Sequence, residues 1–234
     1  MSYVPRAEHY AACGQIRVEN TNWSECLGAC ILIPRDTGLW AVTASHVVKN
    51  IRRSDLVVMH SSSEAILTRR VIERSEIQTK PEHDLVAFLL EGPDRDVPVP
   101  LFSSDKVVFG QEVYLLGYPN LPLPNSEDYI RDVWYGPVLK SGPTSGIFKS
   151  GPDDDTFWLV GAQCNRGFSG GPVCAFTTGD NKSRVIGMTL AMTSDEKERR
   201  MPGDYALQPV SEDAGFTWAL DIGHIIDLFA AYDN

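Results

Sequence analysis

The sequence predicts an all-β protein, and two observations support this prediction. Short apolar or alternating runs recur through the 234-residue chain, and Gly, Pro, Asn, Asp or Ser residues bound each of them. The chain also contains 19 Gly and 15 Pro, which are spread along its length and work against long helices. Many strands at close spacing are typical of a β-barrel or a β-sandwich.

The candidate strands follow one another with only short turns between most of them. In chain order they are residues 29–34, 39–45, 55–61, 65–72, 84–90, 111–118, 132–142, 156–163, 171–176, 184–192 and 216–222. No internal repeat and no low-complexity linker divides the chain. If the strands form two halves, we expect the first to end around 91–106.

One helix is expected, at the C-terminal end. Ile222, Ile225, Ile226 and Phe229 follow the spacing i, i+3, i+4, i+7, with Asp221 in place to act as the N-cap. We therefore expect a short helix over about 221–232 that packs on the β-structure.

Three stretches carry little signal for regular structure: 91–106, 118–130 and 193–214. They are rich in Pro, Asp, Ser and other turn residues, so we expect long surface loops. Long loops in a compact domain are disproportionately functional.

Composition and charge exclude several classes of function. The formal net charge of −10 and the absence of a clustered cationic face argue against binding to nucleic acid. No run approaches the length of a membrane span, and the N-terminal residues lack the apolar core of a signal peptide. We expect a protein of the cytoplasm that does not bind membranes.

The cysteines predict neither disulfides nor a metal site. Their number is odd and no CxxC pair occurs, so we interpret Cys13, Cys26, Cys30, Cys164 and Cys174 as buried thiols. Zinc binding at Cys26 and Cys30 is the alternative, but no second ligand pair stands at a suitable spacing. We expect no metal and no cofactor.

Ser169 lies in the stretch "GAQCNRGFSGGPVCAF", residues 161–176. A serine hydroxyl becomes a nucleophile only when a base accepts its proton and a third group orients that base. His46, in "WAVTASHVV", and Asp84, at the start of "DLVAFLL", are the candidate partners. Glycine at 167 would let a main-chain N–H approach a substrate oxyanion, with the N–H of Ser169 as the second donor.

The blocks "TASHVV", "HDLVAFLL" and "NRGFSGGPV" resemble the three catalytic blocks of the chymotrypsin-like serine proteases, in the same order. The "NRGxSGG" form, "GYP" at 117–119, "GPVLKSG" at 136–142, "RVIGMTLAM" and "FTWALDIGHIIDLF" are most similar to the protease domain of HtrA-type enzymes. The resemblance extends from about residue 26 to the end of the sequence.

This resemblance implies a double β-barrel with the active site between its halves. It implies one peptidase domain over 1–234, with sub-barrels over about 13–100 and 101–220. In this assignment His46 is the general base, Asp84 orients it, Ser169 is the nucleophile and Gly167 contributes to the oxyanion hole.

The resemblance also places the substrate. The specificity pocket would be lined by Gln163, Cys164, Asn165, Leu190, Ala191 and Met192. None of these residues is a carboxylate, and an unpaired buried Lys or Arg would cost several kcal/mol, so the polypeptide substrate is expected to present a small or medium apolar residue.

The departures from the family pattern carry information too. Secreted trypsin-like relatives have Cys after the histidine and Asp before the serine, where this chain has Val47 and Phe168. Activation by a freshly cut N-terminus that pairs with this Asp is therefore not expected. We expect no PDZ domain of the kind that often follows the protease domain in HtrA-type proteins. We expect control by the loops 118–130 and 193–214, through a partner protein or a homo-oligomer.

Two other functions compete with this interpretation. "GFSGG" also fits the nucleophile elbow of α/β-hydrolases, which would make the chain an esterase with His224 as the base. However, Gly170-Gly171-Pro172 is a poor helix start after that serine. A protease-like barrel that only binds is the second alternative, although no residue of the candidate triad is substituted.

Overall fold

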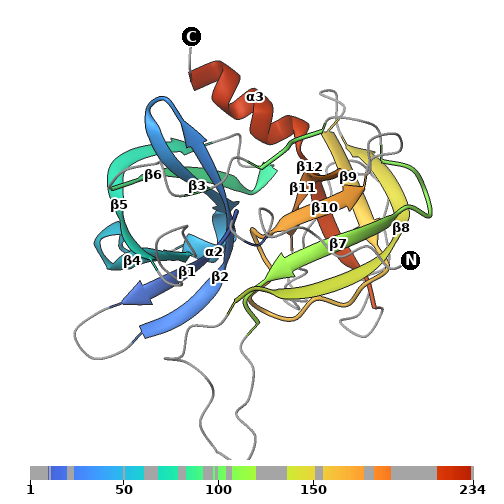
Figure 1. Cartoon of the computed structure of the whole chain (residues 1–234), viewed down its shortest axis with the longest axis horizontal. Coiled ribbons are helices and arrows are strands. Elements are labelled where there is room, and N and C mark those ends of the chain that lie inside the picture. The colour runs from blue at the N-terminus through green and yellow to red at the C-terminus, as the bar shows by residue number, and fades with distance from the viewer. Residues whose placement is uncertain are drawn as a thin grey trace, which may run out of the picture.

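Two closed antiparallel barrels of six strands each lie side by side (Figure 1). The computed structural model describes residues 10, 12–19, 24–49, 51–60, 68–78, 83–91, 97, 100–103, 107–119, 136–150, 155–176, 182–190 and 215–232. The predicted fold class, an all-β double barrel with a short C-terminal helix, is confirmed.

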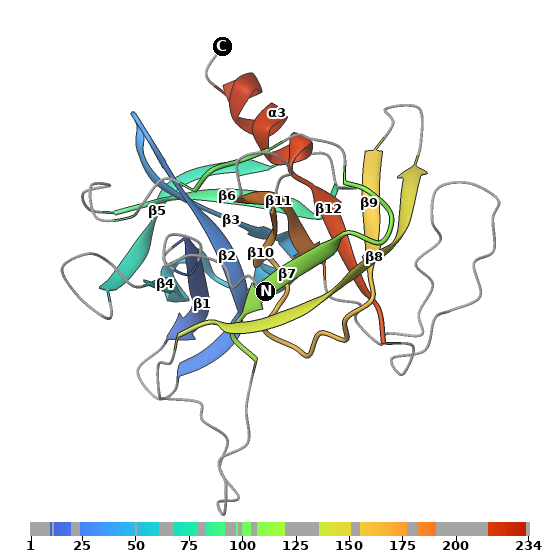
Figure 2. The same ribbon diagram turned by 45° about the vertical axis from the view of Figure 1, so that its right-hand side comes forward.

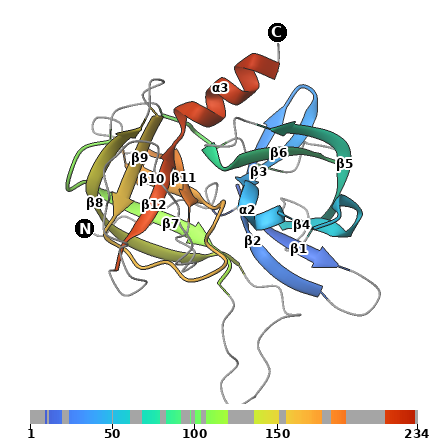
Figure 3. The same ribbon diagram turned by 180° about the vertical axis from the view of Figure 1, so that it is seen from behind.

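The first barrel has the strand order β1-β2-β3-β6-β5-β4. Its strands are β1 (Cys13–Glu19), β2 (Ser24–Arg35), β3 (Gly38–Ala44), β4 (Leu56–His60), β5 (Thr68–Gln78) and β6 (Leu85–Leu90). One helical turn, α2 (Ser45–Val48), follows β3, and a 3₁₀ turn, η1 (Arg53–Asp55), precedes β4. Seen from behind, α2 lies on the side of this barrel that faces the second one (Figure 3).

The second barrel has the strand order β10-β11-β12-β9-β8-β7. Its strands are β7 (Glu112–Gly117), β8 (Val138–Ser150), β9 (Asp155–Val160), β10 (Pro172–Phe176), β11 (Ser183–Leu190) and β12 (Thr217–Asp221). The connection between the barrels pairs with β11, because Phe102 forms a parallel bridge to Val185 and the Val185 N–H donates to Leu101 O at 2.7 Å.

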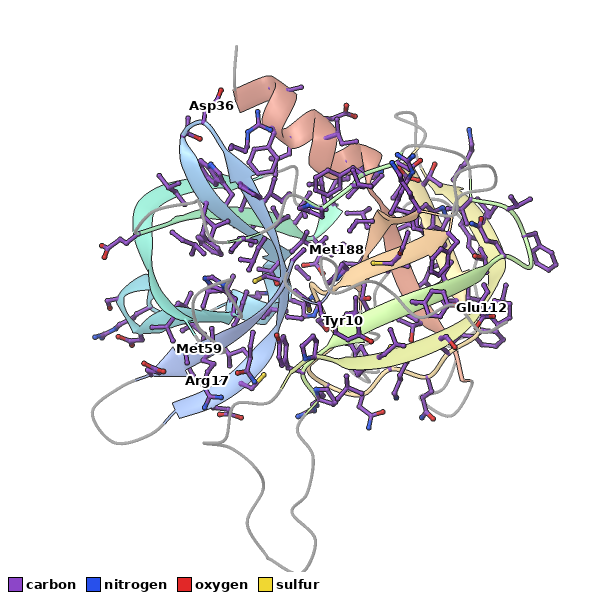
Figure 4. The ribbon with its side chains drawn as sticks, in the orientation of Figure 1. Tyr10, Arg17, Asp36, Met59, Glu112 and Met188 are labelled. Carbon is purple, nitrogen blue, oxygen red and sulfur yellow. The ribbon has the colours of Figure 1, made fainter. Side chains whose placement is uncertain are left out.

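β1 was absent from the predicted strands, although Gln15 and Arg17 alternate with Ile16 and Val18 in its sequence. Gln15 and Arg17 are 1% and 4% exposed, and the Arg17 guanidinium donates to the Gln15 side chain at 3.2 Å. Arg17 is labelled on β1 in Figure 4. Burial of a polar group is tolerated when it is hydrogen-bonded, so both faces of this strand are buried.

Three other strands extend well beyond the predicted runs, and one of them is β2, which begins at Ser24 rather than at residue 29. β5 continues to Gln78 through a polar segment, and β8 begins at Val138 and continues to Ser150. Strand pairing satisfies main-chain donors and acceptors whatever the side chains are, so the ladder extends further than the apolar pattern. The predicted loop 193–214 lies outside the described residues, as does 118–130 apart from Tyr118 and Pro119.

The core is organised in two clusters of buried side chains. One fills the second barrel and includes Trp158 and Phe168. The other fills the first barrel and continues across the junction into β11, β12 and α3. Met188 of β11 belongs to this shared cluster and lies where the barrels meet (Figure 4). Burial of apolar surface therefore holds the two barrels against each other.

The C-terminal helix α3 (Gly223–Tyr232) leaves the end of β12 and reaches toward the first barrel, as Figures 1 and 2 both show. Phe229 packs edge-on against Trp40 of β3, with ring centroids 5.6 Å apart, and the Arg35 guanidinium lies 4.7 Å from the Phe229 ring centre. The helix thus ties the end of the second barrel to the first.

The start of α3 differs by one residue from the prediction. Ile222 O accepts from the N–H groups of Ile225 and Ile226, which makes Ile222 the cap residue. The Asp221 carboxylate instead accepts from the Gly223 N–H at 2.7 Å. No helix in the described part of the chain is long and apolar enough to cross a membrane.

Replacement of Phe229 by alanine tests the helix contact. Phe229 is 2% exposed, and removal of a buried phenylalanine ring costs about 3–5 kcal/mol. Phe229→Ala should lower the free energy of unfolding by this amount in urea denaturation. Ile226, in the same helix, is 43% exposed, and Ile226→Ala should cost less than about 1 kcal/mol. Equal losses in the two variants would show that α3 does not dock through Phe229.

Candidate active site

The candidate base and acid are in direct contact, and the acid holds the histidine at two points. The Asp84 Oδ2 lies 2.5 Å from His46 Nδ1, and Oδ1 accepts the main-chain N–H of His46 at 3.0 Å. Both side chains are less than one-fifth exposed, at 18% and 19%. Because Nδ1 is bound to the carboxylate, Nε2 is the ring nitrogen left to accept a proton.

The main chain of Asp84 is part of the same arrangement. Asp84 O accepts the N–H of Ser45 at 2.9 Å, so the residue also satisfies a main-chain donor at the start of α2. Asp84 has a φ of 48°, the one non-glycine residue in the left-handed region among the described residues. Such a conformation is uncommon outside glycine and clusters at functional sites, where the surrounding contacts maintain it.

Ser169 belongs to the second barrel, but its main chain is bonded to the first. Ser169 O accepts the N–H of Ala29 in β2 at 2.9 Å. A methyl group on Gly28 would lie 2.9 Å from Ser169 O and 2.9 Å from Val47 Cγ1. The Ser169 main chain therefore lies beside Val47, the residue after His46.

Gly170 makes this approach possible. Its φ is 84°, and a side chain here would collide with Thr43 and with the carbonyl oxygen of Ala29. The Gly170 N–H donates to Thr189 O, and the Thr189 N–H donates to Gly171 O, both at 2.8 Å. The turn is thus held by β11 on one side and by the first barrel on the other.

The Ser169 side chain is not hydrogen-bonded to the His46–Asp84 pair in the described part of the chain. Ser169 is 6% exposed. In substrate-free enzymes catalytic hydrogen bonds are often long and tighten only when substrate binds.

Gly167 and Ser169 present main-chain N–H groups with no protein acceptor in the described part of the chain. Gly167 has a φ of 102°, which favours glycine, and a side chain here would collide with the carbonyl group of Tyr118. Two main-chain N–H groups without an acceptor, one of them on the candidate nucleophile itself, can stabilise a developing oxyanion.

Four of the six predicted pocket residues are described, and two of these four contact β12. Gln163 and Asn165 are exposed, Cys164 is half-buried and Leu190 is buried. The Cys164 N–H donates to Thr217 Oγ1 at 3.1 Å. Leu190 of β11 is the antiparallel partner of Trp218, which follows Thr217 in β12. Ala191 and Met192 lie outside the described residues.

Sequence reasoning missed three residues that shape this region. The Thr217 hydroxyl donates to Ala162 O at 2.5 Å, which fixes the start of the segment 162–164. Lys140 of β8 donates to Gln163 O at 2.5 Å and to Asn165 Oδ1 at 3.1 Å. The Tyr118 N–H donates to Gly167 O at 2.9 Å. Lys140 and Tyr118 stand in "GPVLKSG" and "GYP", but no sequence signal indicated their contacts.

Among the described residues, no group of three or more His, Cys, Asp or Glu side chains is placed to hold a metal ion.

All five cysteines are unpaired thiols. Burial raises the pKa of the Cys26 thiol to about 11 and raises those of Cys13, Cys30, Cys164 and Cys174 as well. These thiols are therefore poor nucleophiles.

Comparison with family models identifies the family. A model described as the trypsin-like peptidase domain matches residues 28–188, a span that contains His46, Asp84 and Ser169. The chain belongs to the trypsin-like peptidase family. No curated protein matches this peptidase domain in a search by sequence.

Solved structures share the fold of this trypsin-like peptidase domain at low identity. The Rv3671c protease from M. tuberculosis in its active form superposes with a TM-score of 0.61 and 17% identity, covering 96% of this chain and 82% of that one. The HtrA-type protease AlgW with tripeptide gives 0.59 and 14%, covering 96% and 61%. The serine endoprotease from Yersinia pestis gives 0.59 and 15%, covering 98% and 67%.

The peptidase domain thus spans less than two thirds of the AlgW chain, and at these identities the likeness shows the fold alone. This fold rules out the α/β-hydrolase alternative, which requires a parallel sheet flanked by helices. His224, the base in that alternative, lies in α3, with its ring centre 4.7 Å from that of His83.

Thiol labelling tests the buried cysteines. A raised pKa reduces the thiolate fraction at a given pH, so labelling should be slow at pH 8 and should accelerate as the pH approaches the raised value. For Cys26 the thiolate fraction at pH 8 is on the order of one in a thousand. A thiol-specific chromogenic reagent should react rapidly with all five cysteines in denaturant but slowly with each of them in the native protein at pH 8, with the half-buried Cys164 the fastest. Native thiols that react as fast as those in denaturant would contradict the burial.

Proposed function

We propose that this chain is a serine endopeptidase that cleaves polypeptides through an acyl-enzyme, with His46, Asp84 and Ser169 as its catalytic triad. The observation that carries the proposal is the two-point hold of Asp84 on His46, beside a serine whose main chain is bonded to the same barrel. This arrangement supplies an oriented base and a nucleophile from two different barrels.

In the proposed first step, Ser169 Oγ bonds to the scissile carbonyl carbon as its proton passes to His46 Nε2. Asp84 stabilises the imidazolium that forms, through the contact at Nδ1. The N–H groups of Gly167 and Ser169 donate to the carbonyl oxygen, which now carries the negative charge. The tetrahedral intermediate is thereby stabilised more than the ground state.

In the following steps, His46 gives its proton to the leaving amine and the C–N bond breaks, which leaves the acyl group on Ser169. Water then attacks the ester carbon and loses a proton to Nε2. The bond between that carbon and Ser169 Oγ breaks as His46 returns the proton to Oγ, which releases the carboxylic acid product and restores Ser169. No step requires a metal or a cofactor, since the proton moves between Ser169, His46, water and the leaving group.

The substrate-binding residues are proposed to be Gln163, Cys164, Asn165, Leu190, Ala191 and Met192, with a small or medium apolar side chain in the pocket. Gln163 O already accepts a hydrogen bond from Lys140, so this carbonyl oxygen is not free to bind a cationic substrate side chain.

We also propose that activity is controlled by the loops 118–130 and 193–214, through a partner protein or a homo-oligomer, and that the protein works in the cytoplasm. The five unpaired thiols suit a reducing compartment.

Substitutions in the triad test the mechanism. Ser169→Ala should abolish hydrolysis of a peptide substrate. Asp84→Asn should lower kcat by about 10⁴, since an amide NH₂ beside Nδ1 favours the wrong imidazole tautomer. Asp36, at the exposed tip between β2 and β3, supplies the matched control, and Asp36→Asn should leave kcat unchanged.

Specific activity measured over a range of protein concentrations tests control by assembly. If self-association activates the protein, the specific activity should rise with protein concentration.

A fluorophosphonate, which labels an activated serine, separates this proposal from its alternative. A peptidase should be labelled at Ser169, whereas a protease-like module that only binds should not be labelled at all. Normal hydrolysis by Asp84→Asn would show that the acid is assigned wrongly, and an unlabelled, inactive wild-type protein would refute the proposed function.

Peptide-library profiling tests the pocket. Cleavage should be concentrated after small and medium apolar residues, because an unpaired buried cation would cost several kcal/mol. The readout is the identity of the residue on the amino side of each cleaved bond, determined by mass spectrometry. A profile dominated by Lys or Arg would mean that a carboxylate outside the described residues reaches the pocket.

A further inference from the structure

The residue before the candidate nucleophile is Phe168, and its side chain is fully buried at 0% exposed. It fits a space left by glycine: a methyl group on Gly117 would lie 2.6 Å from Phe168 Cα and 2.7 Å from its ring atoms Cγ and Cδ1. Phe168 therefore sits directly on the end of β7 and joins the core of the second barrel.

Lys140, on the neighbouring strand β8, adds to this contact. Its Nζ lies 5.3 Å from the Phe168 ring centre while it donates to Gln163 O and Asn165 Oδ1. A cation at this distance from an aromatic ring is attracted by the ring. The strand pair β7–β8 thus contacts the segment 163–168 in two ways. It packs against the Phe168 side chain, and Lys140 donates a hydrogen bond to the main chain at Gln163.

The main chain around Gly167 is fixed on both sides of the residue. Asn165 O accepts the N–H of Phe168 at 3.4 Å, so the Arg166–Gly167 peptide is the central unit of a turn. Gly167 O accepts the N–H of Tyr118 at 2.9 Å. With both neighbours held, the direction of the Gly167 N–H is set as well.

Tyr118 carries this hold across to the first barrel. Its hydroxyl donates to Cys13 O in β1 at 2.8 Å, and its own carbonyl accepts the thiol of Cys26 in β2 at 3.4 Å. The residue is 0% exposed. Tyr118 therefore links the Gly167 loop to the barrel that carries His46 and Asp84.

We infer that Phe168 and Tyr118 are positioning residues for the oxyanion hole: Phe168 anchors the Gly167–Ser169 loop by apolar packing against Gly117, and Tyr118 ties that loop to the first barrel. This inference rests on the proposed function. An ion pair at the position of Phe168 would depend on pH, whereas the packed ring has no ionisable group. Among the described residues, the contacts that hold the loop include no carboxylate.

Steady-state kinetics on a peptide substrate test the anchor. Phe168→Ala should lower kcat by about 10²-fold with little change in KM, because an oxyanion donor acts mainly in the transition state. Phe168→Leu, which refills most of the space, should restore most of this loss. Phe229→Ala is the matched control, since it removes an equally buried ring that does not contact the loop, and its kcat should equal that of the wild type.

Tyr118→Phe tests the tether, because it removes only the hydroxyl and keeps the ring and both main-chain contacts. One neutral hydrogen bond is lost, so kcat should fall about three- to tenfold at unchanged KM.

The pH dependence of the wild type tests whether the loop is held without an ion pair. The kcat should stay constant from about pH 8 to 9.5, where a free α-amino group loses its proton.

The outcomes distinguish the two proposals. A wild-type protein that neither hydrolyses peptides nor reacts with a fluorophosphonate refutes the proposed function. An active wild type whose Phe168→Ala variant matches Phe229→Ala in kcat refutes the anchor, and so does a loss that appears in KM alone. An active wild type whose Tyr118→Phe variant keeps full kcat refutes the tether.

Discussion

The contact between the Ser169–Gly170 turn and the first barrel is the constraint on which the rest of the structure depends. A nucleophile from one barrel can serve a base from another only if their side chains come within hydrogen-bond reach, so the two main chains must be held close together. The Ala29 N–H bonded to Ser169 O provides this approach, and it requires the absence of a side chain at Gly170 and Gly28. A Cβ at either position would push the barrels apart at the site itself.

Stability and site geometry are coupled through the shared core. The buried cluster of the first barrel continues into β11, β12 and α3, so the surface that holds the barrels together also holds β11, which bonds the Ser169 turn through Thr189. Phe229 extends this cluster at the end of the chain by packing on Trp40.

Local patterns in the sequence predicted much of the fold. The strands before His46 and after Asp84 were predicted because each is a short apolar run, and nearly all of their residues are buried. β1 was missed although Gln15 and Arg17 alternate with Ile16 and Val18, and the structure buries both of these polar side chains as a hydrogen-bonded pair. The ends of β2, β5 and β8 were missed because backbone pairing continues beyond the apolar runs.

The sequence by itself determined the all-β class, the C-terminal helix and the candidates His46, Asp84, Ser169 and Gly167, because short-range patterns and residue chemistry specify these features. Only the tertiary structure decided that Asp84 contacts His46 at two points, that Ser169 O bonds to Ala29, and that Phe168 packs on Gly117 under Lys140. These contacts join residues far apart in the chain, and the distance between such residues depends on barrel closure and on the packing of one barrel against the other, which no local pattern encodes.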